Sequence, residues 1–230
     1  MRFARILICD IRYQYKYGFY FLYTVIAAVY IGILLMLPQE LQRPAAALII
    51  LSDPAALGFF FIGGMVLLEK GEGLHSYFSI LPASAGEYVL AKALSLSLIS
   101  TAVGVVIAAV TLEQVNYLLF IVGLLIGSAV FTLLGLMTGT FARSVNHYFV
   151  IGFFVGMVLM TPAVLTLFGV THPIFEISPA ALLLRLLYAA VGLDVPYNVY
   201  IGTAGLGIWL LFIYRLTVRR FSSYLMQGGL

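Results

Sequence analysis

The sequence predicts an all-α integral membrane protein that crosses the bilayer six times, a prediction that rests on its composition and on the length of its apolar runs. Of its 230 residues, 63% are hydrophobic and only 9% are charged, and the mean hydropathy is +1.11. A soluble domain carries about a quarter charged residues, so this chain could not cover a surface that faces water. Its apolar residues come instead in runs of about 20, the length that a helix needs to cross a bilayer.

Six apolar runs define the expected spans within one membrane domain, 1–230. Their ranges are 19–37, 55–74, 93–112, 117–141, 148–170 and 198–218. Pro38 ends the first run. The second run is the least regular, because Ser52, Asp53 and Pro54 precede it and Pro54 disfavours helix at Asp53.

The lysines and arginines predict the orientation of these spans. All but two of the 12 fall on one side of the six-span arrangement: Arg2, Arg5, Arg12, Lys16, Lys70, Lys92, Arg143, Arg215, Arg219 and Arg220. Only Arg43 and Arg185 fall on the other side, and an excess of Lys and Arg marks the cytoplasmic side of a membrane protein. We therefore expect a multi-pass protein of a prokaryotic plasma membrane, with both termini and the 69–92 loop in the cytoplasm.

Residues 1–17 precede the first span and mix basic with apolar side chains at helical spacing. This pattern is typical of a helix that lies in the membrane interface. A positively charged topology anchor beside a belt of tyrosines would give the same composition, and the two interpretations can coexist.

The expected spans contain almost no ionisable group deep in the bilayer. Glu69 and Lys70 lie at the inner end of the second span, and Glu113 lies at the outer end of the third. Ion carriers and proton pumps usually keep such costly charges within their spans for function. With no buried charge to compensate an ion, a pathway through this chain is expected to suit apolar or amphipathic molecules, such as lipid-like molecules or drugs.

Five residues are candidates for lining that pathway. Tyr20, Tyr23 and Tyr30 share one face of the first span, and Tyr30 is deep enough for its hydroxyl to need a partner. Met65 and Met157 could line an adaptable apolar path, although methionines on a membrane helix more often pack or face lipid.

Three glycine pairs with GxxxG spacing lie in the spans. They are Gly123/Gly127, Gly135/Gly139 and Gly152/Gly156. Because this spacing lets helix backbones approach closely, the pairs are expected to serve packing within the chain rather than a homodimer face.

Motifs for catalysis, metal binding or nucleotide hydrolysis are missing from the sequence. It has no HExxH or GxSxG pattern, no GxxxxGK[ST] phosphate loop and a single cysteine, Cys9. We therefore expect no enzyme activity, no metal or cofactor in this chain and no nucleic-acid partner. Energy for active transport would have to come from another subunit.

The segment EKGEGLHSYFSILPASAGEYVLAK, residues 69–92, is the longest charged stretch between two spans. Glycines follow its acidic start, a short apolar stretch 74–81 comes next, and Pro82 and Ser84 restart the chain before the third span. A short helix with Tyr77 and Phe78 on its surface would offer an apolar knob to a cytosolic partner. An ordinary connecting loop explains the segment equally well.

This pattern of Glu-Lys, Gly, a short aliphatic stretch, Leu-Pro and Glu-Tyr-x-x-x-Lys resembles the cytoplasmic loop of ABC-2-type transporter permeases. The stretch DPAALGFFFIGG with LLEKGEG is similar to permeases of the fluoroquinolone-exporter group. In ABC-2 permeases the loop between spans two and three contains the coupling helix that docks on the ATPase. Six spans, cytoplasmic termini and a basic interfacial helix agree with that family.

The resemblance implies the positions that couple the chain to an ATPase. They are Glu69, Gly71, Gly73, Leu74, Leu81, Pro82, Glu87 and Lys92, to which the apolar knob adds Tyr77 and Phe78. The resemblance also implies a broken, partly re-entrant outer helix pair within 171–197, where Ser178-Pro179 begins a helix.

The resemblance further implies an exporter permease that forms a homodimer and binds two copies of a separate ATPase, which holds ATP and Mg²⁺. A heterodimeric permease half is a second possibility. A non-transporting membrane subunit or sensor that docks a cytosolic partner through the 69–92 loop is the alternative from another class.

Overall fold

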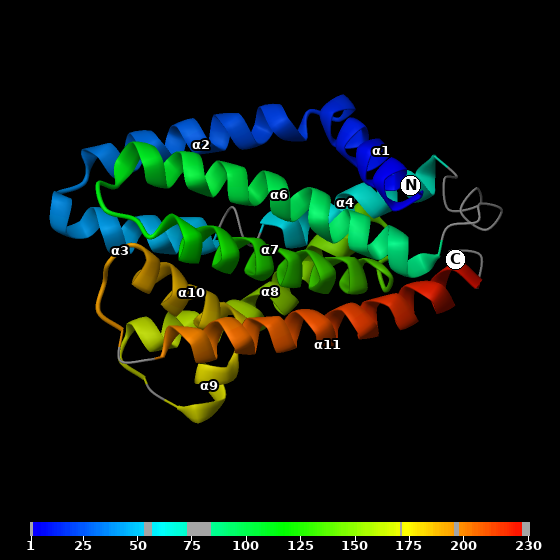
Figure 1. The fold of residues 1–230 in the computed structure, drawn as a ribbon. Coiled ribbons are helices and arrows are strands. Elements are labelled where there is room, and N and C mark those ends of the chain that lie inside the picture. Colours follow the sequence, from blue (N-terminus) through cyan, green and yellow to red (C-terminus); the bar gives the residue numbers. More distant parts are fainter. Residues whose placement is uncertain (1, 53–56, 73–83, 171, 196–197, 227–230) are drawn as a thin grey trace.

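The computed structural model describes residues 2–52, 57–72, 84–170, 172–195 and 198–226, which are mostly helical. The helices are α1 (Arg2–Lys16), α2 (Phe19–Met36), α3 (Gln39–Ile50), α4 (Leu57–Gly71), α6 (Ala85–Thr111), α7 (Tyr117–Gly139), α8 (Val145–Leu167), α9 (Pro173–Ile177), α10 (Pro179–Ala190) and α11 (Val199–Met226). The long helices run side by side, and the start of α1 and the end of α11 lie at the same end of the bundle (Figure 1). We call this the α1 end.

Five helices among the described residues, α2, α6, α7, α8 and α11, are long and apolar enough to cross a membrane. They match the first, third, fourth, fifth and sixth expected spans. The helices α6 and α11 extend beyond the predicted ranges at the α1 end, where α6 begins at Ala85 and α11 continues to Met226. An all-helical, multi-pass membrane fold is therefore confirmed.

The chain between α2 and α6 differs from a regular second span. Helix α3 has 12 residues and α4 has 15, so α4 is about 22 Å long, shorter than the roughly 30 Å of a bilayer core. The two helices follow one another along the bundle toward the α1 end (Figure 1). Ala46, Ala47 and Ile50 of α3 are fully buried in the core. The predicted helix break at Asp53 lies outside the described residues.

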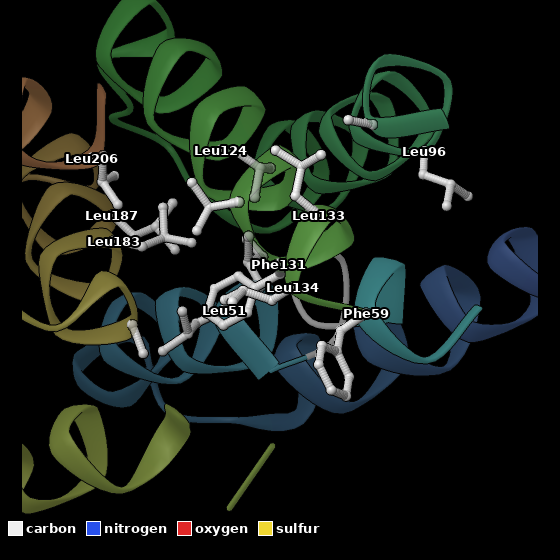
Figure 2. Close-up of a cluster of buried hydrophobic side chains, with 14 of the residues drawn as sticks. Leu51, Phe59, Leu96, Leu124, Phe131, Leu133, Leu134, Leu183, Leu187 and Leu206 are labelled. Carbon is white, nitrogen blue, oxygen red and sulfur yellow. The ribbon is translucent and has the colours of Figure 1, made fainter. Parts of the chain in front are cut away.

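Helix α7 forms the centre of the bundle. In the most apolar 18-residue windows, 67% of α7 and 56% of α6 are buried, against 17% of α2 and 11% of α8. Leu124 and Phe131 of α7 belong to one buried cluster with Leu51 and with Leu183 and Leu187 of α10 (Figure 2). The outer helices α2 and α8 thus leave apolar faces exposed, as a lipid environment requires.

Glycines allow the close approach of helices to α7. A Cβ atom on Gly135 would lie 2.3 Å from the carbonyl oxygen of Phe59 in α4, and one on Gly127 would lie 2.4 Å from Leu183 in α10. The other members of the GxxxG pairs also face parts of the same chain within 4 Å. The prediction that these glycines serve internal packing is confirmed.

The stretch after α8 contains the two short helices α9 and α10. Ser178 separates them and accepts a hydrogen bond from the amide of Ala181, with Pro179 at the first helical position. The predicted helix start at Ser178-Pro179 is confirmed. Arg185 of α10 pairs with Glu176 of α9 at 3.4 Å, which holds the two helices together.

Candidate functional site

The two flanks of the 69–92 segment are well-formed helix ends. Glu69 lies in the last turn of α4. Helix α6 begins with a capping box, in which the hydroxyl of Ser84 accepts from the amide of Glu87 and the Glu87 carboxylate accepts from the amide of Ser84. This fixed start places Tyr88, Lys92 and Ser95 on one face of α6, because residues three and four apart share a face of a helix.

Helix α1 presents polar side chains to that face of α6. Asp10 is 5% exposed and Gln14 is fully buried, while Arg5, Arg12 and Lys16 lie on the exposed side of α1. Polar residues on the inner face of an amphipathic helix need partners within the protein.

Lys92 provides those partners by joining three helices. Its ammonium donates hydrogen bonds to the carboxylates of Asp10 in α1 and Glu69 in α4. The three side chains are only 3–5% exposed. We name Asp10, Glu69 and Lys92, with the polar groups that bind them, the Lys92 cluster.

Neutral donors complete the cluster. Tyr88 donates to Glu69, and Ser95 donates to Asp10. The amide of Gln14 donates to Asp10 at 3.1 Å and to Ser95 at 2.8 Å. Each carboxylate therefore accepts hydrogen bonds in addition to its ion pair, which is what a buried ion pair needs to offset the cost of desolvation.

Apolar and aromatic groups close the cluster around the ammonium. The Lys92 nitrogen lies 5.5 Å from the ring centre of Tyr13 and 5.4 Å from that of Tyr88, within the range of cation–π attraction. The sulfur of Met65 lies 2.9 Å from the same nitrogen. These contacts keep water away from the charges.

A second set of contacts, at the edge of the Lys92 cluster, connects α1 to the end of α4. The hydroxyl of Tyr17 donates to Glu72, which directly follows α4. The rings of Tyr13 and Tyr17 pack with their centres 4.4 Å apart. Burial raises the pKa of Tyr13, and the charges of Glu69 and Glu72 raise it further.

Helix α11 supports the start of α6 from the opposite side. The ring of Tyr88 stacks on the buried ring of Phe221, with centres 4.8 Å apart and planes 7° apart. The hydroxyl of Tyr214 donates to the carbonyl of Gly86 at 3.3 Å. Four helices, α1, α4, α6 and α11, thus meet around the first turns of α6.

A family model, described as the fluoroquinolones export permease protein family, matches residues 1–228. The chain belongs to this family. Fluoroquinolones export permease proteins from two strains of Mycobacterium tuberculosis are each 29% identical to it over 164 residues, which are 70% of this chain and 69% of each relative. The resemblance to the permeases of fluoroquinolone exporters is therefore confirmed.

Four of the predicted coupling residues lie among the described residues of this family member. Glu69 and Lys92 are buried partners in the Lys92 cluster, Glu87 caps α6, and Gly71 is exposed in the last turn of α4. The remaining positions lie outside the described residues: Gly73, Leu74, Tyr77, Phe78, Leu81 and Pro82. Their role in coupling stays a prediction.

Asp10 is a site residue that the sequence analysis did not identify. A usable signal exists in hindsight, because Asp10 and Gln14 are four apart and fall on the face of α1 opposite to Arg5 and Arg12. An acidic side chain on the inner face of a basic helix indicates a buried cation opposite it.

Three charged side chains at or outside the ends of the expected spans are buried: Asp10, Glu69 and Lys92. The prediction of almost no ionisable group deep in the spans did not concern them, because none lies in the middle of an expected span. The packing of α1 over the ends of α4 and α6 removes these charges from water.

The structure places the predicted pathway residues in different surroundings. Tyr20 and Tyr23 line a cavity of about 510 Å³ between α2 and α6, and Tyr30 is not part of its lining. Met65 is fully buried beside Lys92. Met157 is exposed on α8 and borders a separate cavity of about 250 Å³ among phenylalanines.

Proposed function

We propose that the chain is the membrane-spanning permease subunit of an ATP-driven ABC exporter of the ABC-2 type. Its family and its relatives bear the description of export permeases. The sequence has no phosphate-binding loop, so ATP and Mg²⁺ bind to a separate ATPase subunit and this chain is not an enzyme. Its substrate is apolar or amphipathic, a lipid-like molecule or a drug.

The topology of this proposal has six crossings, in which α3 and α4 together form the second. Both termini and the 69–92 segment face the cytoplasm, and α1 lies in the inner membrane interface. The segment 171–197, with α9 and α10, lies at the outer side. Cysteines introduced at Ser76 or Ser222 in a Cys9→Ser background are then shielded from an impermeant thiol reagent in intact cells, whereas one at Gln39 reacts. Labelling at Ser76 would contradict this orientation.

The observation that supports the mechanism most is the Lys92 cluster. It bonds α1 directly to both flanks of the 69–92 segment, with Asp10 on one side and Glu69 and Lys92 on the other. A force that an ATPase applies to this segment would therefore reach α1, α4 and α6 together. ATP must favour one arrangement of these helices over another for such a force to exist.

The proposed assembly contains two copies of the permease and two ATPases, with the transport path between the permease chains. The GxxxG glycines are used within the chain, so the dimer interface would use other surfaces. A non-transporting membrane subunit or sensor that docks a cytosolic partner is the second candidate, because the same cluster would transmit binding without transport.

The proposal is tested by purifying the full-length chain from native membranes and measuring the ATPase that accompanies it. We expect a phosphate-loop ATPase, and its activity should rise with amphipathic substrates in nanodiscs. Leu81→Asp, or Tyr77→Ala with Phe78→Ala, should weaken the association by roughly tenfold or more, as the loss of an apolar anchor does at protein interfaces. Ile174→Asp in α9, an exposed position, is the control and should leave association unchanged.

Three outcomes separate the candidates. Unchanged ATPase binding and transport in both loop variants would make the segment an ordinary connector. A stable partner without stimulation by any substrate would favour the sensor. Stimulation by small hydrophilic solutes alone would contradict the proposed substrate class.

A further inference from the structure

The cavity between α2 and α6 ends at the Lys92 cluster. Its lining includes Ala27 of α2, Ile99 and Val103 of α6, and Ile11 of α1. Ser95 belongs both to this lining and to the cluster, because its hydroxyl donates to Asp10. The cavity is therefore apolar along its length and polar at the end nearest the charges.

The outer rim of the cavity faces the surroundings of the bundle. Leu98 and Val106 of α6 are 48% and 51% exposed and also line it. Thr24 borders it from the exposed side of α2. A molecule could enter between α2 and α6 from the membrane without passing through the packed core. The volume of about 510 Å³ is in the range of pockets that hold drug-sized ligands.

Ser95 is the member of the Lys92 cluster that lines the cavity, and Asp10 and Gln14, which bond to Ser95, lie behind it. The groups behind Ser95 carry an excess of negative charge and of hydrogen-bond acceptors. The Lys92 cluster contains two carboxylates and one ammonium, and no other described cation pairs with it. The side-chain oxygen of Gln14 is buried and has no hydrogen-bond partner among the described residues. A ligand that brings a positive charge and N–H donors would match both excesses.

We propose that this cavity binds an amphipathic amine, with its ammonium group at Ser95 and its apolar body between α2 and α6. The inference deepens the proposed function, on which it rests, by naming the head group of the substrate. An ammonium that donates to Ser95 lies close to Asp10, and Coulomb attraction is strong in such a poorly solvated place. A sulfate or carboxylate head in the same position is repelled.

The experiment measures binding of radiolabelled dodecylammonium to the full-length chain in phosphatidylcholine nanodiscs, with empty nanodiscs as background. No ATPase is present, so the result does not depend on transport. We expect saturable binding, displaced by unlabelled dodecylammonium at a concentration on the order of tenfold lower than by dodecyl sulfate or dodecyl glucoside, since tenfold corresponds to a small difference in binding free energy. The three competitors share one chain and differ only in head group.

Ala102→Phe tests the location of the site. Ala102 lines the cavity and is exposed, so the larger ring occupies the cavity without entering the core. The control is Ala204→Phe in α11, an exposed position that lines a different cavity of about 750 Å³. We expect the first variant to lose roughly tenfold in affinity and the control to bind as the wild type does.

Asp10→Asn tests the charge. With one carboxylate removed, the cluster is neutral, and the preference for dodecylammonium over dodecyl glucoside should disappear while the alkyl chain still binds. No saturable binding, equal displacement by the three head groups, or unchanged affinity in Ala102→Phe would each overturn the proposal.

Two further results identify the source of the ligand and separate this inference from the proposed function. Competition by a two-chain lipid with a primary ammonium head, added to the nanodiscs, assigns the site to a lipid, and lack of competition assigns it to a soluble amphiphile; both support an amine site. Stimulation of the ATPase by amphipathic amines that Ala102→Phe leaves intact would overturn the site but keep the exporter. Binding of dodecylammonium as predicted, in a chain that has no ATPase partner, would keep the amine site but overturn the exporter proposal.

Discussion

The α1 end of the bundle and its centre both contain buried side chains, but different interactions stabilise the two regions. At the centre, α7 meets α4 and α10 through glycines and branched aliphatic side chains, with Gly135 against the backbone of Phe59. At the α1 end, Lys92 joins Asp10 and Glu69 by ion pairs among buried hydrogen-bond donors. The stability of the centre therefore depends on how closely its side chains fit, and the stability of the α1 end depends on the pairing of its charges.

This difference has a functional consequence. Close packing admits one geometry, because interiors resist any change in volume. Ion pairs and hydrogen bonds link specific side chains on α1, α4 and α6, and the same links join both flanks of the proposed docking segment. The helices proposed to receive a force from a partner are thus connected by directional bonds, whereas the centre is held together by closely fitting side chains.

Lys92→Met should cause the largest loss of stability. Methionine keeps much of the side-chain volume but leaves two buried carboxylates without a cation, which costs about 3–5 kcal/mol when one partner of a buried pair is removed. The measurement is the free energy of unfolding in mixed micelles. Lys16→Met, on the exposed side of α1, is the control and should change stability by less than about 0.5 kcal/mol. Equal effects at the two positions would show that the cluster contributes no stability.

Gly135→Ala should destabilise the centre by about 2–3 kcal/mol, because the added methyl group meets backbone that cannot move aside easily. Gly64→Ala in α4 is the matched control, since a Cβ atom there meets nothing within 4 Å. The same unfolding measurement applies. If Gly135→Ala were as stable as the control, close packing at Gly135 would not be what determines the stability of the centre.

The sequence predicted the parts of this structure that depend on local pattern. Five spans follow from apolar runs, the start of α10 follows from Ser178-Pro179, and the internal use of the glycine pairs follows from their spacing. The interrupted second span was foreseen as irregular, but the lengths of α3 and α4 depend on how they pack against α6, α7 and α10.

The candidate site could be predicted only in part. The loop motif pointed to Glu69 and Lys92, but not to the bond between them, since they are 23 residues apart and Asp10 is 82 residues from Lys92. Tyr20 and Tyr23 share a cavity because they lie on one helix. Met65 and Met157 do not join them, because the direction in which each helix faces is set by tertiary packing.

Tyr13 gives a smaller, pH-dependent effect at the α1 end. Its pKa is raised in the folded state, chiefly by burial, so the folded chain keeps a proton that the unfolded chain loses near pH 10. The stability from this group is fully present below pH 10 and is lost as the pH rises beyond it. Tyr13→Phe should therefore lose less stability than the wild type between pH 9 and pH 11, by roughly 1 kcal/mol or less for a shift over this range. Parallel curves for the two proteins would contradict the assignment.

The most direct test of the charge link between α1 and the flanks of the 69–92 segment is a double-mutant cycle on Asp10 and Lys92. Unfolding free energies are measured for Asp10→Asn, Lys92→Met and the double variant, with Asp10→Asn and Glu113→Gln as a control cycle across the bundle. We expect a coupling energy of about 1–3 kcal/mol, in the range of residues in direct contact, with the double variant more stable than the sum of the single effects implies. Additive effects at Asp10 and Lys92, as expected for the control cycle, would contradict it.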